Sequence, residues 1–322
     1  LREVADVSMN PDMLHIATQE ELIAAARNHD VIFCLLHDRI NRDVIAANPE
    51  LKAIASTTIT PADIDIAEAT RRRIPVTVIP SSLLDDATSD LAWALLFAVG
   101  RRVVEADRLA RAGVIPGSQS NFLSATGISG KTLGILGAGG VGRAMAKRAT
   151  GFPMRRVYHD PKRLSPEDEA ALGLQWLPFD ELLATADYLS IHVNLNPKTR
   201  HLIGPRELAL MKPGAYLINT ARGPICDTSA LLAGLKSGKL GAVGLDVLPK
   251  EPASTADPLV AAWQANEPWI RGRMLLNPHA AFFSPNSLAD LRRKAIETAY
   301  DYLCEGKLAN CVNAEYLKNP RK

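Results

Sequence analysis

The feature that most restricts the fold of this chain is a glycine-rich segment, GAGGVG at positions 137–142. It follows the apolar run KTLGIL and opens a stretch with helical spacing of apolar residues, Val141 to Thr150. A strand, a tight glycine turn and a helix in this order are typical of the first βαβ unit of a Rossmann fold. The sequence therefore predicts a parallel sheet with helices on its faces.

The positions of this motif have separate physical tasks. Gly137 permits the tight turn, Gly139 lets a diphosphate approach the backbone, and Gly142 lets the helix lie close to the strand. The exposed amides and the positive end of the helix dipole would then hold the diphosphate. The predicted cofactor-binding residues of the motif are Gly137, Gly139, Gly140, Val141 and Gly142. The alternative is a glycine-rich turn that binds nothing.

Asp160 ends the next predicted strand about 20 residues further on, where a carboxylate would bind the adenosine ribose hydroxyls. A carboxylate repels the extra phosphate of NADP and accepts a hydrogen bond from the free 2'-hydroxyl of NAD. NAD is therefore the favoured cofactor over NADP. Lys162 and Arg163 follow closely and could pair with a 2'-phosphate, although two cations after a turn are usually a solvated face.

The rest of the chain alternates short β-rich runs with amphipathic helical stretches, which predicts βαβ units. We expect strands at 31–36, 51–56, 75–78, 132–136, 156–159, 188–191, 215–219, 242–246 and 274–276, and short helices at 42–47 and 63–72. One long helix is expected from Asp85 to about Ala112, capped by Gly113 and followed by an arm over 113–130. A final helix, from about Pro285 to Glu305, could pack on the first domain.

Composition excludes several classes of protein. A length of 322 residues suggests two domains. The 37 Lys and Arg residues against 35 Asp and Glu residues lack the basic excess of a dedicated nucleic-acid binder. The longest apolar run, Leu91 to Gly100, reaches half of the ~20 residues that a membrane span needs. We therefore expect neither nucleic acid nor a membrane as a partner.

The cysteines and the N-terminus carry further expectations. Cys34, Cys226, Cys304 and Cys311 form no CxxC pair and no set with neighbouring His at metal-ligand spacing, so neither a disulfide framework nor a zinc site is indicated. A cytoplasmic location fits this pattern. Residues 1–7 have the pattern of a helix end followed by a short strand, and we expect a strand and part of a helix to precede them.

Three further segments lie at or just beyond the carboxyl ends of predicted strands, where open α/β sheets place their ligands: NTARG (219–223), GLDVLPKEP (244–252) and NPHAAFFSP (277–285). Together with GAGGVG they resemble the D-isomer-specific 2-hydroxyacid dehydrogenase family, the NAD enzymes that include glyoxylate and hydroxypyruvate reductases. The resemblance covers nearly the whole chain, in the family's order and spacing. It implies an α/β fold of two doubly wound parallel-sheet domains. A Rossmann cofactor domain (87–285) would be inserted into a flavodoxin-like substrate domain (1–86 and 286–322).

The resemblance implies three catalytic residues. Arg222 matches the substrate-binding arginine, whose planar fork suits a carboxylate. His279 matches the general acid/base, since imidazole titrates near neutrality. Glu251 matches the carboxylate that fixes the tautomer and favours the protonated ring. Without the motifs, a surface ion pair, a structural histidine and an exposed loop carboxylate would be the ordinary interpretations.

The resemblance also implies cofactor contacts outside the glycine motif. At the nicotinamide end they are Thr88, Thr220, Ala221 and Asp246, the last as partner of the carboxamide. His192 and Thr199 fall where the family shapes the adenosine pocket, although Asn194 replaces the usual proline.

The substrate side departs from the family pattern. Family members bind the substrate carboxylate through a glycine-containing loop, but here the segment is STTITPADID, with Thr60 in place of the glycine. A β-branched residue does not readily adopt positive φ, so this loop must differ locally. Thr58, Ile59 and Thr60 are the candidates for this side of the pocket, or the loop merely links a strand to a helix. Phe282 is a candidate cover for a substrate tail, or a core residue.

The favoured function is hydride transfer between NAD(H) and a small 2-hydroxy or 2-keto acid. Because HAAFFSP and NCVNAEY resemble the C-terminal-binding-protein branch, the alternative is an NAD-sensing regulatory protein like those co-repressors. Oxidation of phosphite or formate is a third interpretation, disfavoured because Thr58 to Thr60 contain no cation. The family further implies a homodimer through the cofactor domain, with the helix from Asp85 and its arm as the contact.

Overall fold

The computed structural model describes residues 2, 5–10, 12, 15–61, 63–114, 123 and 125–317. The chain forms two compact units, one from Leu84–Phe283 and one from Leu1–Leu83 with Ser284–Lys322. The second unit is therefore built from both ends of the chain. The expected divisions, between 86 and 87 and between 285 and 286, lie within three residues of these boundaries.

The larger unit contains a seven-stranded sheet in the order β10-β9-β8-β7-β4-β5-β6, with every pairing parallel. Its strands are β4 (Thr132–Leu136), β5 (Arg155–His159), β6 (Gln175–Trp176), β7 (Tyr188–Ile191), β8 (Ala215–Asn219), β9 (Leu240–Leu245) and β10 (Met274–Leu276). Numbered from β4, the first six follow the 3-2-1-4-5-6 order of a Rossmann fold. All six expected strands of this unit are present, and β6 was not predicted.

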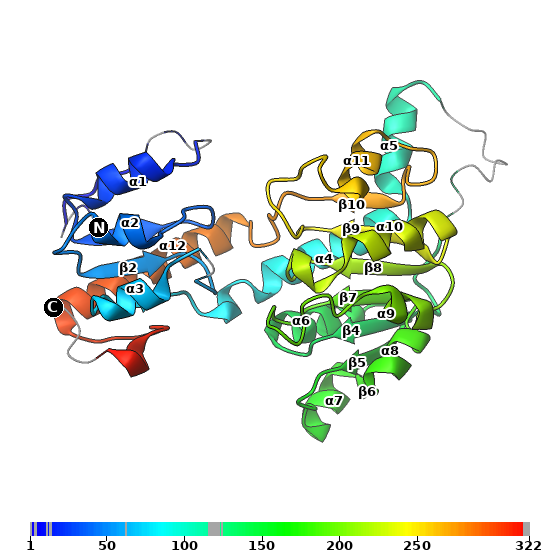
Figure 1. Ribbon diagram of the computed structural model, residues 1–322. Helices are drawn as coiled ribbons and strands as arrows, with labels where there is room; N and C mark the ends of the chain where they lie inside the picture. The colour runs from blue at the N-terminus through cyan, green and yellow to red at the C-terminus, as the bar shows by residue number, and fades with distance from the viewer. Residues whose placement is uncertain are drawn as a thin grey trace. The chain divides into compact units, whose positions relative to one another are not determined.

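Helices cover both faces of this sheet (Figure 1). They are α4 (Asp85–Gly100), α5 (Val103–Arg111), α6 (Gly140–Ala149), α7 (Pro166–Leu172), α8 (Phe179–Thr185), α9 (Pro205–Leu210), α10 (Thr228–Ser237) and α11 (Pro258–Gln264), with a 3₁₀ turn η3 (Gly223–Ile225). Successive residues of a strand face opposite sides. Leu217 accordingly joins the buried cluster under α8 and α10, and Ile218 joins the cluster under α4 and α6.

The expectation of one helix from Asp85 to Ala112 was wrong. The chain breaks between α4 and α5, where Arg102 has a left-handed φ of 53°. The break follows Gly100, where an added Cβ would lie 2.9 Å from the Tyr188 hydroxyl, and glycine is a poor helix former. Arg102 then donates to Glu105 over 2.7 Å within α5. Most of the expected arm, residues 115–122 and 124, lies outside the described residues.

The smaller unit contains a parallel sheet of three described strands in the order β1-β2-β3. Its elements are α1 (Gln19–Ala26), β1 (Val31–Cys34), α2 (Arg42–Ala46), β2 (Ala53–Ser56), α3 (Ile66–Arg71), β3 (Val76–Thr77), η1 (Ser81–Leu83), α12 (Pro285–Glu305) and η4 (Ala314–Tyr316). Helix α12 packs on β2 and β3. Buried Asn313 accepts from the Val76 amide and donates to the Ile74 carbonyl, both over 3.0 Å, which ties the chain's end to β3. Three strands are fewer than a complete flavodoxin-like sheet has, and the pattern expected over 1–7 includes residues 1, 3 and 4, which lie outside the described residues.

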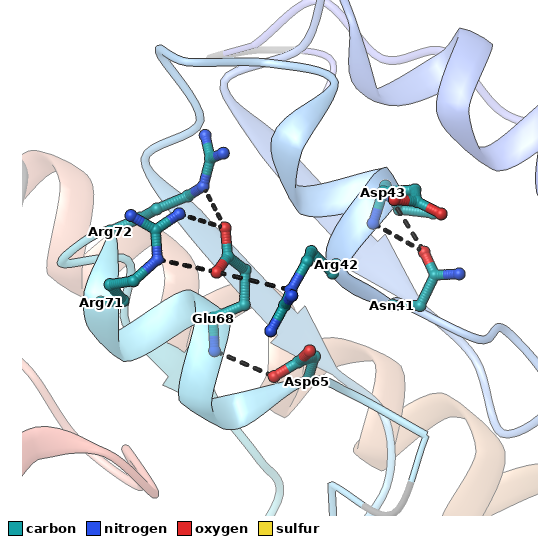
Figure 2. Close-up of polar contacts among 8 residues, drawn as sticks. Asn41, Arg42, Asp43, Asp65, Glu68, Arg71 and Arg72 are labelled. Carbon is teal, nitrogen blue, oxygen red and sulfur yellow. Dashed lines mark hydrogen bonds and ion pairs between the residues drawn. The ribbon is translucent and has the colours of Figure 1, made fainter.

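An ion-pair cluster joins α3 to α2 on this unit (Figure 2). Glu68 is 4% exposed and accepts from Arg71 over 2.9 and 2.7 Å and from Arg72 over 2.6 Å. Arg42 lies 3.9 Å away on α2. Hydrogen bonds from Arg71 and Arg72 hold the pKa of Glu68 at about 2, so the carboxylate stays charged at neutral pH.

No helix in the described part of the chain is long and apolar enough to cross a membrane.

Candidate active site

The glycine segment lies at the carboxyl end of β4, between β7 and β5, where the strand order reverses. Gly137 has φ of 97°, and a Cβ there would lie 2.8 Å from the backbone of His192. A Cβ at Gly142 would overlap the Gly137 carbonyl, whereas one at Gly139 would meet nothing within 4 Å. Gly137 and Gly142 thus let the turn and the helix pack closely on the strand, and Gly139 leaves space in front of the backbone. This arrangement fits a dinucleotide diphosphate at the switch point of the sheet.

Asp160 follows β5 at the edge of the glycine turn. The Ala138 amide donates to its Oδ2 and the Lys162 amide donates to its Oδ1, both over 2.9 Å. The Arg163 guanidinium is bound to Glu169, to which it donates two hydrogen bonds over 2.8 Å. These bonds, with one from Tyr158, hold the pKa of Glu169 at about 2. The one carboxylate at the expected ribose position is therefore not neutralised by Arg163.

His279 and Glu251 are in direct contact. His279 Nδ1 lies 2.7 Å from Glu251 Oε2, and their side chains are 19% and 27% exposed. The other oxygen, Oε1, accepts from the Leu248 amide over 2.9 Å, which fixes the carboxylate. A carboxylate on Nδ1 favours the tautomer with the proton on that nitrogen and leaves Nε2 as an acceptor.

A second carboxylate positions the loop that carries His279. Asp246, 1% exposed at the end of β9, accepts from Asn277 Nδ2 over 2.6 Å, from the Ala280 amide over 2.9 Å and from the Ala281 amide over 3.0 Å. Its carbonyl accepts from the His279 amide over 2.8 Å. His279 has a left-handed φ of 52°, a conformation that persists where surrounding contacts determine it. Asn277, which sequence reasoning missed, is part of that support. The asparagine beside the expected histidine in NPHAA was its signal.

Arg222 lies in the loop after β8. Asn219, 1% exposed, accepts from the Ala221 amide over 3.0 Å and donates to the Arg222 carbonyl over 3.1 Å. Burial lowers the pKa of the Arg222 guanidinium, and the charges of Glu251 and Asp246 oppose that shift. In the larger unit, the charge of Glu251 therefore acts on the Arg222 guanidinium, and Glu251 also contacts His279. Sequence reasoning also missed the part of Asn219, whose buried amide after an apolar strand was its signal.

The residues expected at the adenosine pocket make local contacts. His192 Nε2 lies 2.8 Å from Ser190 Oγ, and burial lowers the pKa of His192 to about 4. The imidazole is therefore neutral near pH 7. The Thr199 hydroxyl donates to the Asn194 carbonyl over 2.6 Å and closes the turn between them.

The residues expected at the nicotinamide end also lie in the larger unit. Thr88 is half-buried in the first turns of α4, and Ala221 is half-buried after β8. Thr220 is 5% exposed, and its hydroxyl oxygen has no hydrogen-bond partner among the described residues. An orphaned buried hydroxyl at the carboxyl end of a strand fits a ligand that supplies the missing partner.

The substrate candidates are divided between the units. Thr58, Ile59 and Thr60 belong to the smaller unit, where the Thr58 hydroxyl donates to the Thr60 carbonyl over 2.7 Å. Thr60 is exposed and does not have positive φ, so this loop differs from a glycine turn as expected. Phe282 is half-buried and belongs to the larger unit. Within the described ranges, no three His, Cys, Asp or Glu side chains gather in a way that could hold a metal ion.

The family model for the NAD binding domain of the D-isomer specific 2-hydroxyacid dehydrogenases matches residues 93–281, more than half of the chain. This chain belongs to that family. The dehydrogenase is 44% identical over 235 residues to a glyoxylate reductase of Thermococcus litoralis, covering 72% of this chain and 70% of that protein. It is 38% identical over 304 residues to a glyoxylate reductase of Aeropyrum pernix, covering 93% of this chain and 87% of that protein.

Solved structures agree with this assignment. The crystal structure of a glyoxylate reductase from Paecilomyes thermophila superposes on this dehydrogenase with a TM-score of 0.76 at 32% identity, covering 92% of this chain and 89% of that one. The dehydrogenase is therefore an NAD-linked oxidoreductase that interconverts 2-hydroxy and 2-keto acids. These relatives favour this activity over the co-repressor alternative, and they do not support the specific likeness to the C-terminal-binding-protein branch.

Proposed function

We propose that this dehydrogenase reduces a small 2-keto acid of the glyoxylate and hydroxypyruvate class with NADH, and catalyses the reverse oxidation with NAD. The observation that carries the proposal is the 2.7 Å contact between His279 Nδ1 and Glu251 Oε2, with the half-buried guanidinium of Arg222 within reach of the Glu251 charge. The glyoxylate reductase names of the relatives support this substrate class. We propose the cytoplasm as the site of action, because the cysteine spacing in the sequence is not that of a disulfide framework.

Each residue has a chemical task in this proposal. Arg222 binds the substrate carboxylate and polarises the neighbouring keto oxygen, because its planar fork can donate several hydrogen bonds at once. His279 delivers a proton from Nε2 to that oxygen as the alcohol forms, and removes it in the reverse direction. Glu251 accepts a hydrogen bond from Nδ1 of His279, and its negative charge stabilises the imidazolium. NAD(H), when bound, supplies or accepts the hydride at C2.

The cofactor would be held by the chain's own cradle and carboxylate. Amides of the glycine segment would bind the diphosphate, and Asp160 would bind the adenosine ribose. Thr88, Thr220, Ala221 and Asp246 are the proposed contacts at the nicotinamide end, and His192 and Thr199 those at the adenosine. Asp160 disfavours a 2'-phosphate, and Arg163 is engaged by Glu169, so we propose a preference for NADH over NADPH.

We also propose that the dehydrogenase is a homodimer that associates through the cofactor domain. Two exposed apolar side chains support this proposal. Val103, the first residue of α5, is 53% exposed, and Val114, beyond the end of that helix, is 49% exposed. An interface over this region would remove these apolar side chains from water.

A substrate panel tests the proposed activity. We expect steady-state turnover of at least one small 2-keto acid with NADH, and a kcat at least about 100-fold lower in His279→Ala, because the general acid is removed. The dissociation constant of NADH, measured by fluorescence, should change less than about twofold. Tight NADH binding with negligible turnover across the panel would instead favour a regulatory protein, and full activity of His279→Ala would refute the role of His279.

A further inference from the structure

A carboxylate lies against the glycine cradle. Helices α4 and α6 pack on each other, and their N-terminal residues, Asp85 and Gly140, are in contact. A Cβ built on Gly140 would overlap the carbon and both oxygens of the Asp85 carboxylate. Gly140 is the first residue of α6 and the third glycine of GAGG, so the carboxylate lies against the end of the helix whose amides a diphosphate would use.

This carboxylate differs from the other acidic groups at the start of α4. Asp86 and Asp90 form ion pairs with Arg148 of α6 over 2.9 and 2.6 Å. Asp85 has no hydrogen bond or ion pair with any described residue. The neighbouring cation on α6, Arg143, is bound to Asp168 over 2.8 Å. The charge of Asp85 is therefore not neutralised by a cation of α6.

The position of Asp85 at this helix end has one effect in the free enzyme and the opposite effect on cofactor binding. The N-terminus of a helix carries partial positive charge and stabilises a nearby anion. In the free protein Asp85 is that anion. Burial and the charge of Asp86 raise the pKa of Asp85, because both disfavour its ionised form. A diphosphate at the same helix end would be repelled by it.

We propose that Asp85 weakens NAD(H) binding, because its carboxylate lies against the first residue of α6 and repels the incoming diphosphate. This inference rests on the proposed function, since it takes the glycine cradle as the cofactor site. Asp85 then acts as a determinant of cofactor affinity that favours rapid exchange of NAD for NADH between turnovers. The repulsion acts on the diphosphate and not on the adenosine or the nicotinamide.

Isothermal titration of the full chain with NADH and with ADP-ribose tests this inference. We expect Asp85→Asn to lower both dissociation constants about tenfold, which corresponds to about 1.4 kcal/mol. The difference from the native protein should shrink at high salt, because ions screen the repulsion. Adenosine, measured by competition with NADH, lacks the diphosphate and should bind the two proteins within about twofold. Asp85→Ser provides a second test of the same charge removal.

Asp86→Asn is the matched control, since it removes a neighbouring carboxylate that Arg148 already neutralises, and it should change the dissociation constants less than about twofold. Unchanged or weaker binding of ADP-ribose by both Asp85 variants would overturn the inference and leave the proposed function standing. An equal gain in Asp86→Asn would also overturn it, because the effect would then come from net charge alone. Failure of every variant and the native chain to bind NADH would overturn the proposed function, and the inference with it.

Discussion

The 2.7 Å contact between His279 Nδ1 and Glu251 Oε2 leaves Nε2 as the imidazole nitrogen that we propose to exchange a proton with substrate. Glu251 is itself anchored by the Leu248 amide, so the carboxylate cannot turn away from Nδ1 without losing a second hydrogen bond. A neutral neighbour would leave the tautomer free and would not stabilise the charged ring. The partial exposure of both side chains is consistent with a group that must meet a substrate.

A different histidine makes the stability of the fold depend on pH. Burial lowers the pKa of His192 from 6.5 to about 4. Between these values the unfolded chain binds a proton that the folded chain does not, so the free energy of unfolding falls as pH falls. We expect a loss of about 2 kcal/mol between pH 7 and pH 5, measured by urea unfolding of the cofactor-free protein.

His192→Gln provides the comparison for this prediction, because an amide does not titrate. The window avoids Glu68 and Glu169, whose pKa of about 2 places their contributions below pH 4.5. A native profile that is flat from pH 7 to pH 5, or one that His192→Gln reproduces, would show that this histidine is not buried in its neutral form.

At the scale of elements, the loop 277–281 is held in shape by the end of a neighbouring strand. Asp246 receives three hydrogen bonds from this loop, and its backbone carbonyl receives a fourth. Two carboxylate oxygens can accept about four hydrogen bonds. One acceptor position therefore remains for the cofactor contact that the sequence predicts for Asp246.

Removal of one support should disturb catalysis without contact to the reacting atoms. We expect Asn277→Ala to lower the free energy of unfolding by about 1 to 3 kcal/mol, because a buried acceptor loses its donor. His279 should be less well held, and kcat should fall about tenfold with little change in the NADH dissociation constant. Exposed Asn286→Ala on α12 is the control, and equal effects of the two substitutions on kcat would contradict this role of Asn277.

At the scale of the whole molecule, the proposed dimer has a direct test. Sedimentation of the native protein should give twice the 34.8 kDa mass of one chain. Val103→Glu places a charge on an exposed apolar position of α5 and should shift the mass towards one chain at micromolar concentration. A native monomer, or a Val103→Glu dimer of unchanged affinity, would remove α5 from the interface.

Much of the larger unit could be predicted from local pattern. Its strands are short apolar runs bounded by turn residues, and β4, β7, β8 and β10 match the expected ranges residue for residue. Strand β6 escaped prediction because Gln175–Trp176 is two residues long and carries no alternating pattern. The glycine motif and the segments after β8, β9 and β10 likewise identify the family, since their residues are close in sequence.

The sequence by itself determined six of the seven strands of the larger unit and the motifs that identify the family, because each depends on residues within one turn or one strand. The cofactor cradle and the three catalytic candidates follow from the family resemblance of those motifs and stay predictions. Only the tertiary structure decided the break before α5, the contact of Asp85 with Gly140 and the hydrogen bonds from Asn277 to Asp246. Asn277 and Asp246 lie 31 positions apart along the chain, and Asp85 and Gly140 lie 55 apart. The break follows Gly100, which lies close to Tyr188, 88 positions further along. Periodicity and propensity describe neighbours in sequence, whereas distant partners are fixed by how the helices and the sheet pack.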